Sequence, residues 1–166
     1  MQTTPTEMTR TDQPPNVRPS SWLSTCRDRR VLTGRVADMR QLAEPYATPT
    51  GRRVRLFTAL GFDVDVLPDR GMDIGDSSFA GLPLTFCTPA LWEPPPAGGT
   101  DSFAQRFGGG LLTTCGWDHF GSPVIDHGQL LPQHGRATEL IAADVSTGGE
   151  WTNSGYRIWV SGRMRQ

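Results

Sequence analysis

The stretch "GFDVDVLP" (residues 61–68) contains the clearest structural pattern in the chain. Apolar side chains alternate in it with the carboxylates of Asp63 and Asp65. Successive side chains of an extended strand point to opposite faces, so this alternation predicts a strand with a buried apolar face and a solvent-facing acidic one. Gly61 separates it from "RRVRLFTAL" (residues 52–60), which we expect to be a second strand joined to the first by a tight turn.

Similar β-prone segments occur later in the chain. In "SGYRIWVSGRMRQ" (residues 154–166) the side chains of Tyr156, Ile158 and Val160 share one face of a predicted strand. Two further segments read as short apolar strands, "GLPLTFCTPALW" (residues 81–92) and "GGLLTTC" (residues 109–115). Together these segments predict an all-β protein, an antiparallel β-sandwich of many short strands.

Composition agrees with this fold class and limits the function. The 166 residues suit one ordinary domain, and 19 glycines with 14 prolines favour a turn-rich β protein. We expect residues 1–30 to be a disordered or irregular tail and residues 31–166 to form the β domain. A net charge of −1 gives no electrostatic reason to expect nucleic acid or an anionic membrane as partner.

Further features of the sequence concern the cellular location of the protein. No apolar run is long enough to cross a membrane, and the amino-terminal residues lack the apolar segment of a secretory signal. The three cysteines lie far apart, without a CxxC pair, which favours a reducing compartment. These observations predict a cytoplasmic protein.

The segment "RFGGGLLTTCGWDHFG" (residues 106–121) raises four chemical possibilities. The first is a phosphate cradle at its glycines, which lacks a P-loop pattern and its lysine because all 16 basic residues are arginines. The second is Cys115 as a nucleophile beside His119, for which no helix brings the two together.

The third possibility is a metal, and the fourth is a neutral polar ligand such as a sugar. The residues that could bind a metal are His119, His127, His134, Asp118 and Asp126. They are scattered without a recognised ligand spacing, so we predict no metal site. A sugar site would use arginines, carboxylates, a histidine and aromatic rings, all of which the chain supplies at low net charge. The glycines then allow close backbone approach, and Cys115 serves packing.

Three ordered segments connect the chain to a family. They are "LPDRGMDIGDSSFAGLPLTF" (residues 67–86), "RFGGGLLTTCGWDHFG" (residues 106–121) and "LLPQHGRATEL" (residues 130–140). In this order and spacing they resemble the DUF4432 family, which is related to aldose 1-epimerases (galactose mutarotases). The resemblance runs over residues 54–143 and extends toward the end of the chain. It implies a galactose mutarotase-like supersandwich and a small-molecule sugar as partner.

The resemblance also implies site residues. His134 in "QHGR" is similar to the histidine of the mutarotase "LHGG" motif beside the anomeric centre, which makes it the predicted catalytic residue. Arg106 is placed similarly to a mutarotase arginine that contacts sugar hydroxyls. Asp118 and Arg136 belong to the family pattern, and we expect both to bind substrate.

The "DRGMDI" segment (residues 69–74) supplies the last predicted substrate contact, Arg70. An alternative for Arg70 is a salt bridge with Asp73 in a turn after the strand, and the sequence leaves both readings open.

The implied reaction is interconversion of sugar anomers or a related sugar isomerisation, by ring opening at C1. A base removes the proton of the anomeric hydroxyl while an acid protonates the ring oxygen, so no cofactor is required. In mutarotases a second histidine and a catalytic glutamate come later in the chain, whereas only Glu139 and Glu150 follow His134 here. The resemblance therefore implies an incomplete, amino-terminal portion of the fold that is not a competent mutarotase by itself. The alternative is a non-catalytic sugar-binding module or an inactive gene fragment.

Overall fold

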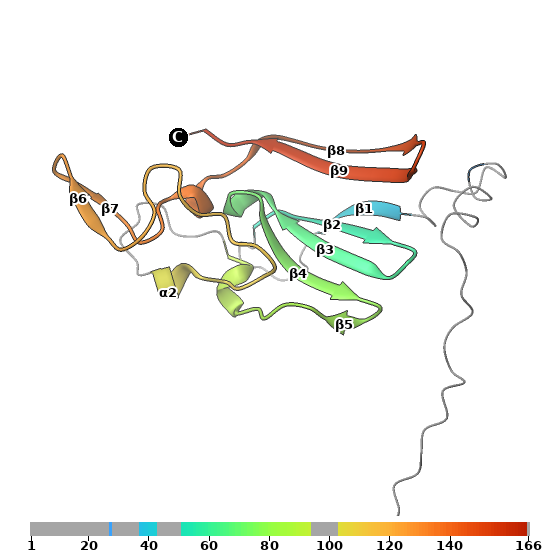
Figure 1. The fold of residues 1–166 in the computed structure, drawn as a ribbon, viewed down its shortest axis with the longest axis horizontal. Coiled ribbons are helices and arrows are strands. Elements are labelled where there is room, and N and C mark those ends of the chain that lie inside the picture. The colour runs from blue at the N-terminus through green and yellow to red at the C-terminus, as the bar shows by residue number, and fades with distance from the viewer. Residues whose placement is uncertain (1–26, 28–36, 43–50, 94–102, 166) are drawn as a thin grey trace, which may run out of the picture.

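The computed structural model describes residues 27, 37–42, 51–93 and 103–165, and within them the chain is built from antiparallel strands (Figure 1). One sheet has the order β1-β2-β3-β4-β5, and two separate hairpins pair β6 with β7 and β8 with β9. The strands are β1 (Ala37–Leu42), β2 (Arg53–Thr58), β3 (Phe62–Leu67), β4 (Asp73–Phe79), β5 (Leu82–Pro83), β6 (Val124–Asp126), β7 (Gln129–Leu131), β8 (Ala143–Thr152) and β9 (Gly155–Arg163). The prediction of an antiparallel all-β fold is confirmed.

Single-turn helices connect the strands. They are η2 (Pro68–Arg70), η3 (Pro89–Leu91), α2 (Phe103–Arg106) and η4 (Ala137–Glu139). Figure 1 shows all four near the same end of the sheet, opposite the turns that join β2 to β3 and β8 to β9. This end, which we call the loop end, therefore brings together segments that are far apart in the sequence.

The two central strands match the predicted pair. β2 and β3 are antiparallel with Val54 opposite Val66, and the turn between them places Gly61 at a φ of 87°. Directly opposed residues share a face of the sheet, so the buried valines of both strands meet on one side. The described apolar core is completed by Leu67, Leu91, Ala137 and Ala142.

The acidic face of β3 corrects one prediction. Asp65 is 0 % exposed, although the alternating pattern places it on a solvent-facing side. Its carboxylate accepts hydrogen bonds from Nε and Nη2 of Arg55 at 2.7 and 2.9 Å, and Arg53 lies 3.6 Å away. The β2–β3 register puts Arg55 opposite Asp65, and the hydrogen bond to this carboxylate raises the pKa of Arg55. Paired arginines thus allow a charged residue to be buried.

The β8–β9 hairpin confirms the second alternating pattern. Tyr156, Ile158 and Val160 are half-buried, whereas Arg157 and Trp159 between them are exposed. Figure 1 shows this hairpin running alongside the sheet, and β9 contacts β1 and β2. The apolar side of β9 thus takes part in packing, as the period of two predicts.

Two predicted strands are wrong or much shorter than expected. Residues 81–92 contain only the two residues of β5 and the turn η3. Residues 109–115 form no strand; Gly109 and Leu112 make isolated bridges to Cys87 and Ile74. The reason is backbone conformation, because φ at Gly109 is 78° and at the next glycine 93°, which is incompatible with an extended strand.

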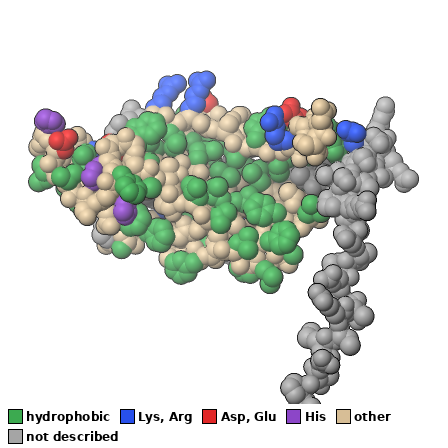
Figure 2. All heavy atoms as spheres, in the orientation of Figure 1, with side chains coloured by type: hydrophobic (Ala, Val, Ile, Leu, Met, Phe, Trp, Pro, Cys, Tyr) green, Lys and Arg blue, Asp and Glu red, His purple; other side chains and the backbone are tan. Residues whose placement is uncertain are grey.

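The surface differs between the two ends of the sheet. Figure 2 shows apolar side chains over the face formed by β4, β5 and the following loop, and the histidines at the loop end. Large exposed apolar residues of that face are Phe79, Leu82, Leu84 and Phe86. The histidines of the chain therefore lie at the loop end, whereas arginines and carboxylates also occur on the β8–β9 hairpin.

One prediction falls on another part of the chain. The predicted tail, residues 1–30, lies outside the described residues apart from Arg27. In the part of the chain that the structure describes, no helix has the length and apolar character needed to cross a membrane.

Candidate functional site

The glycines of residues 108–110 bring their segment into direct backbone contact with β4 and the loop after β5. A Cβ on Gly109 would lie 2.1 Å from the carbonyl oxygen of Phe86, and one on Gly110 would lie 2.6 Å from that of Ile74. The N–H of Gly110 donates to the Phe86 carbonyl at 2.8 Å. The glycines therefore serve close approach, as predicted, and this packing lies two residues after Arg106.

Arg70 lies at the end of η2 and is buried. Its Nη1 donates to the carbonyl oxygens of Ala90 at 2.9 Å and Glu93 at 2.8 Å, and its Nη2 donates to that of Arg106 at 2.6 Å. Its Nε lies 3.6 Å from Asp73, so the salt-bridged turn is present. Burial lowers the pKa of Arg70; Asp73 opposes that shift and the charge of Arg106 adds to it. Arg70 thus holds three loop segments together.

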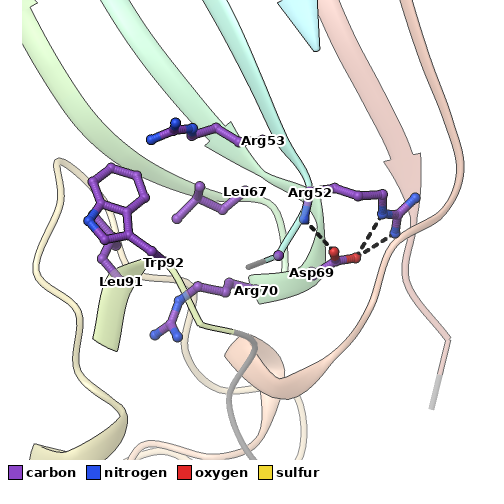
Figure 3. A pocket seen from close by; sticks show the side chains of 8 residues that line it. Arg52, Arg53, Leu67, Asp69, Arg70, Leu91 and Trp92 are labelled. Carbon is purple, nitrogen blue, oxygen red and sulfur yellow. Dashed lines mark hydrogen bonds and ion pairs between the residues drawn. The ribbon is translucent and has the colours of Figure 1, made fainter. Parts of the chain in front are cut away.

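Figure 3 shows a pocket that Arg70 helps to line. This small pocket is lined by residues that include Arg53, Leu67, Leu91 and Trp92, with the guanidinium of Arg53 over the Trp92 ring. Its volume of about 10 Å³ corresponds to about one water molecule. This pocket is far too small for a sugar.

Asp73 is a carboxylate of the loop end and is almost fully buried. The backbone N–H of Thr114 donates to Oδ1 at 2.5 Å, and the hydroxyl of Thr138 donates to Oδ2 at 3.0 Å. Burial raises the pKa of Asp73, against these hydrogen bonds and the charge of Arg70. Asp73 therefore ties β4 to the 109–115 segment and to η4.

Arg106 is 2 % exposed and is the last residue of α2. Its Nη1 donates to Oε1 of Glu139 in η4. Within the described chain its Nε and Nη2 are buried and have no hydrogen-bond partner. A buried polar group without a partner costs roughly 1–3 kcal/mol, so the unpaired Nε and Nη2 atoms of Arg106 need an explanation.

Glu139 is a site residue that sequence reasoning set aside. Burial raises the pKa of its carboxyl group, while Arg106 and Arg136 oppose the shift. The sequence signal was its position five residues after His134, within the segment "LLPQHGRATEL". Its pairing with Arg106 depends on contact between α2 and η4, which no local pattern predicts.

Asp118 and Arg136, both predicted to bind substrate, contact each other. Nε of Arg136 donates to Oδ2 of Asp118 at 2.7 Å, and the Arg136 backbone N–H donates to Oδ1 at 3.3 Å. Burial disfavours the charged form of Asp118, but the hydrogen bonds from Arg136 outweigh it and lower the pKa of the carboxyl group. Both side chains retain partial exposure, so the pair borders solvent.

Two interlocked loops, residues 116–121 and 132–135, hold the backbone of His134. Its N–H donates to the Gly121 carbonyl at 2.9 Å, and its own carbonyl accepts from Gly116 at 2.8 Å. A Cβ on Gly135 would lie 2.2 Å from the Gly116 carbonyl oxygen, so the crossing requires glycine. His134 itself has a φ of 62°, and Trp117 in the facing loop has a φ of 83°. Left-handed residues other than glycine are costly and concentrate at functional sites.

The ring of His134 lies between aromatic side chains. Its centroid is 4.7 Å from that of Phe103 in α2, edge to face, and 5.3 Å from that of Phe120, whose side chain is largely exposed. Within the described chain the buried Nδ1 of His134 has no hydrogen-bond partner. α2 therefore contributes both Phe103 beside His134 and Arg106 beside Glu139.

The geometry gives no support to the two possibilities that the sequence disfavoured, a catalytic thiol and a metal site. Cys115 is exposed, and Nε2 of His119 lies 2.7 Å from the Ser122 carbonyl oxygen. In the described ranges no three histidine, cysteine or carboxylate residues are grouped so as to hold a metal.

Comparison with known proteins gives one match. A family model described as "Domain of unknown function (DUF4432)" matches residues 50–166. No curated protein and no solved structure matches the chain significantly.

Proposed function

Since the chain belongs to the DUF4432 family over residues 50–166, we propose that it is a carbohydrate-binding protein of the aldose 1-epimerase type, with its site at the loop end. The observation that carries the proposal is His134, held in a left-handed conformation by two interlocked loops next to the Asp118–Arg136 pair. Such local strain is retained where the surrounding structure enforces it, which is common in binding and catalytic sites.

The chemical groups around His134 suit a polyol. The Asp118–Arg136 pair offers acceptors and planar donors at the protein surface, and the exposed ring of Phe120 offers an apolar platform. Sugar sites combine directional polar groups of this kind with an aromatic face against the sugar ring. Arg70 supports the site from within, because its donors are bound to backbone carbonyls.

Anomer interconversion is the activity proposed for this site, although the resemblance alone implied a chain without the later acid and base of mutarotases. In this reaction a base takes the proton of the anomeric hydroxyl, an acid protonates the ring oxygen, and the bond between C1 and the ring oxygen breaks to give the open aldehyde. Reclosure on the other face gives the second anomer. His134 is the proposed proton-transfer group at the anomeric centre, and Glu139 is the buried carboxyl that could act as the other group, since its pKa is raised.

Calorimetric titration with a panel of aldohexoses tests the binding proposal. We expect measurable binding by the intact chain and its loss in His134→Ala. His127→Ala is the matched control, because His127 lies in the β6–β7 turn with a side chain 96 % exposed. If no sugar binds, or if both variants bind as the intact chain does, the proposal is wrong.

Polarimetry tests the activity separately. A freshly dissolved single anomer should equilibrate faster with the protein than without it, and Glu139→Gln should remove most of the acceleration, since a proton-transfer group contributes roughly a hundredfold or more. Binding without acceleration would leave the non-catalytic sugar-binding module as the function.

A further inference from the structure

Two side chains that belong to α2 or contact it have buried nitrogen atoms without a hydrogen-bond partner among the described residues. Within the described residues, Nε and Nη2 of Arg106 and Nδ1 of His134 are buried without a hydrogen-bond partner. The two side chains are linked through this short helix, because Phe103 at its start contacts the His134 ring and Arg106 is its last residue. Native proteins leave few buried polar atoms unsatisfied, so the two unpaired nitrogens on one guanidinium indicate that an acceptor is to be supplied.

The neighbouring residues do not supply it. The one described carboxylate bonded to Arg106 is that of Glu139, and it engages Nη1. Asp73 is occupied by Thr114 and Thr138. Arg70 is a second buried arginine close by, and the charge of Arg106 adds to the effect of burial in lowering the pKa of Arg70. Nε and Nη2 of Arg106 are therefore left without an acceptor among these neighbours.

The free atoms of Arg106 define the shape of the missing acceptor. Nε and Nη2 form one edge of the planar guanidinium and present two parallel N–H groups. A carboxylate supplies two oxygens at matching separation and makes two charge-assisted hydrogen bonds with such an edge. A single sugar hydroxyl offers one oxygen and no charge.

We propose that the Nε–Nη2 edge of Arg106 binds the carboxylate of a sugar acid, so that the ligand of this site is a hexuronate-type molecule. The inference rests on the proposed function, since it places the rest of the sugar near His134. The carboxylate satisfies both free nitrogens of Arg106, while Glu139 continues to hold Nη1.

Calorimetry on the full chain tests this with four probes: glucuronate, its neutral methyl ester, glucose and acetate. Loss of a charge-assisted hydrogen bond weakens binding by roughly ten- to a hundredfold, so we expect glucuronate to bind at least about tenfold more tightly than the ester or glucose. Acetate, which lacks the sugar, should bind more weakly than glucuronate.

Each other result has a distinct meaning. Equal affinity for glucuronate, ester and glucose overturns the carboxylate contact and leaves sugar binding intact. Acetate binding as tightly as glucuronate overturns the sugar acid in favour of a simple carboxylate. Absence of binding by all sugars overturns both this inference and the proposed function.

Arg106→Lys assigns the contact to its residue, because lysine keeps the charge and loses the planar edge. We expect it to remove the preference for glucuronate over the ester. Arg157→Lys is the matched control, since Arg157 also pairs with a glutamate, Glu150, but on the exposed β8–β9 hairpin. A preference that survives in Arg106→Lys overturns the assignment. If Arg106→Lys does not fold, the comparison of acid and ester on the unaltered protein still decides the carboxylate contact.

Discussion

Arg106 and Glu139 form a buried ion pair between α2 and η4, although 33 residues separate them in the sequence. The pair connects the segment before the glycine run to the segment after His134. Because both side chains are buried, each depends on the other for compensation of its charge.

The first prediction concerns this pair. Arg106→Gln removes the partner of Glu139 and leaves a buried carboxylate uncompensated, so we expect a loss of about 3–5 kcal/mol in the free energy of unfolding. Urea denaturation monitored by circular dichroism measures it. Arg157→Gln breaks an exposed pair and should change stability by about 1 kcal/mol or less. Equal effects of the two substitutions would show that the Arg106 pair is not buried as described.

The second prediction isolates the close approach of the glycine run. Gly109 and Gly81 have similar φ values, 78° and 80°, but a Cβ on Gly109 would meet the Phe86 carbonyl oxygen at 2.1 Å whereas one on Gly81 has open space. Gly81→Ala should cost about 1–2 kcal/mol for its backbone conformation. Gly109→Ala should cost about 1–3 kcal/mol more, from overpacking. Thermal denaturation of the two variants compares them directly, and similar melting temperatures would contradict the contact.

The third prediction concerns the buried carboxylate of β3. Asp65→Asn weakens the charge-assisted hydrogen bonds from Arg55 and removes the charge facing Arg53, and we expect about 1.5–3 kcal/mol of destabilisation in urea. Asp126→Asn on the exposed β6 strand is the control, with a change of about 0.5 kcal/mol or less. An Asp65→Asn protein as stable as the control would mean that Asp65 faces solvent, as the alternating pattern by itself suggests.

The fourth prediction is a pH dependence of stability. The pKa of Glu139 is raised by burial, so the folded protein binds this proton more tightly than the unfolded chain. Above the unfolded pKa of about 4.3 and up to the folded pKa, the native state holds more protons, and stability falls as pH rises. Glu139→Gln should flatten this slope in urea titrations. Asp73, whose pKa is also raised, retains its own contribution.

Asp118 serves as a control, because its effect on the pH dependence of stability has the opposite sign to that of Glu139. Its pKa is lowered in the folded protein, so its stabilisation is present above the unfolded pKa of about 3.9 and is lost as pH falls through the folded pKa. Asp118→Asn should therefore alter only the acid limb of the stability curve. If Glu139→Gln leaves the slope above about pH 4.3 unchanged, the carboxyl group of Glu139 is not the titrating one.

The amino-acid sequence alone determined the strand pair at β2 and β3, the alternating face of β9, and the role of the glycines in close approach. These features are local: a period of two and glycine without a Cβ follow from the backbone of a few neighbouring residues. The ordered motifs likewise identified the family now matched over residues 50–166.

Tertiary structure decided how charged residues are used. Asp65 is buried because strand register sets Arg55 opposite it, and Glu139 enters the site because α2 and η4 meet there. Residues 109–115 form a loop because Gly109 and Gly110 have positive φ values where the backbone meets β4, which an extended strand does not allow. Partners of this kind lie far apart along the chain, so their pairing depends on the packing of the whole sheet and its loop end.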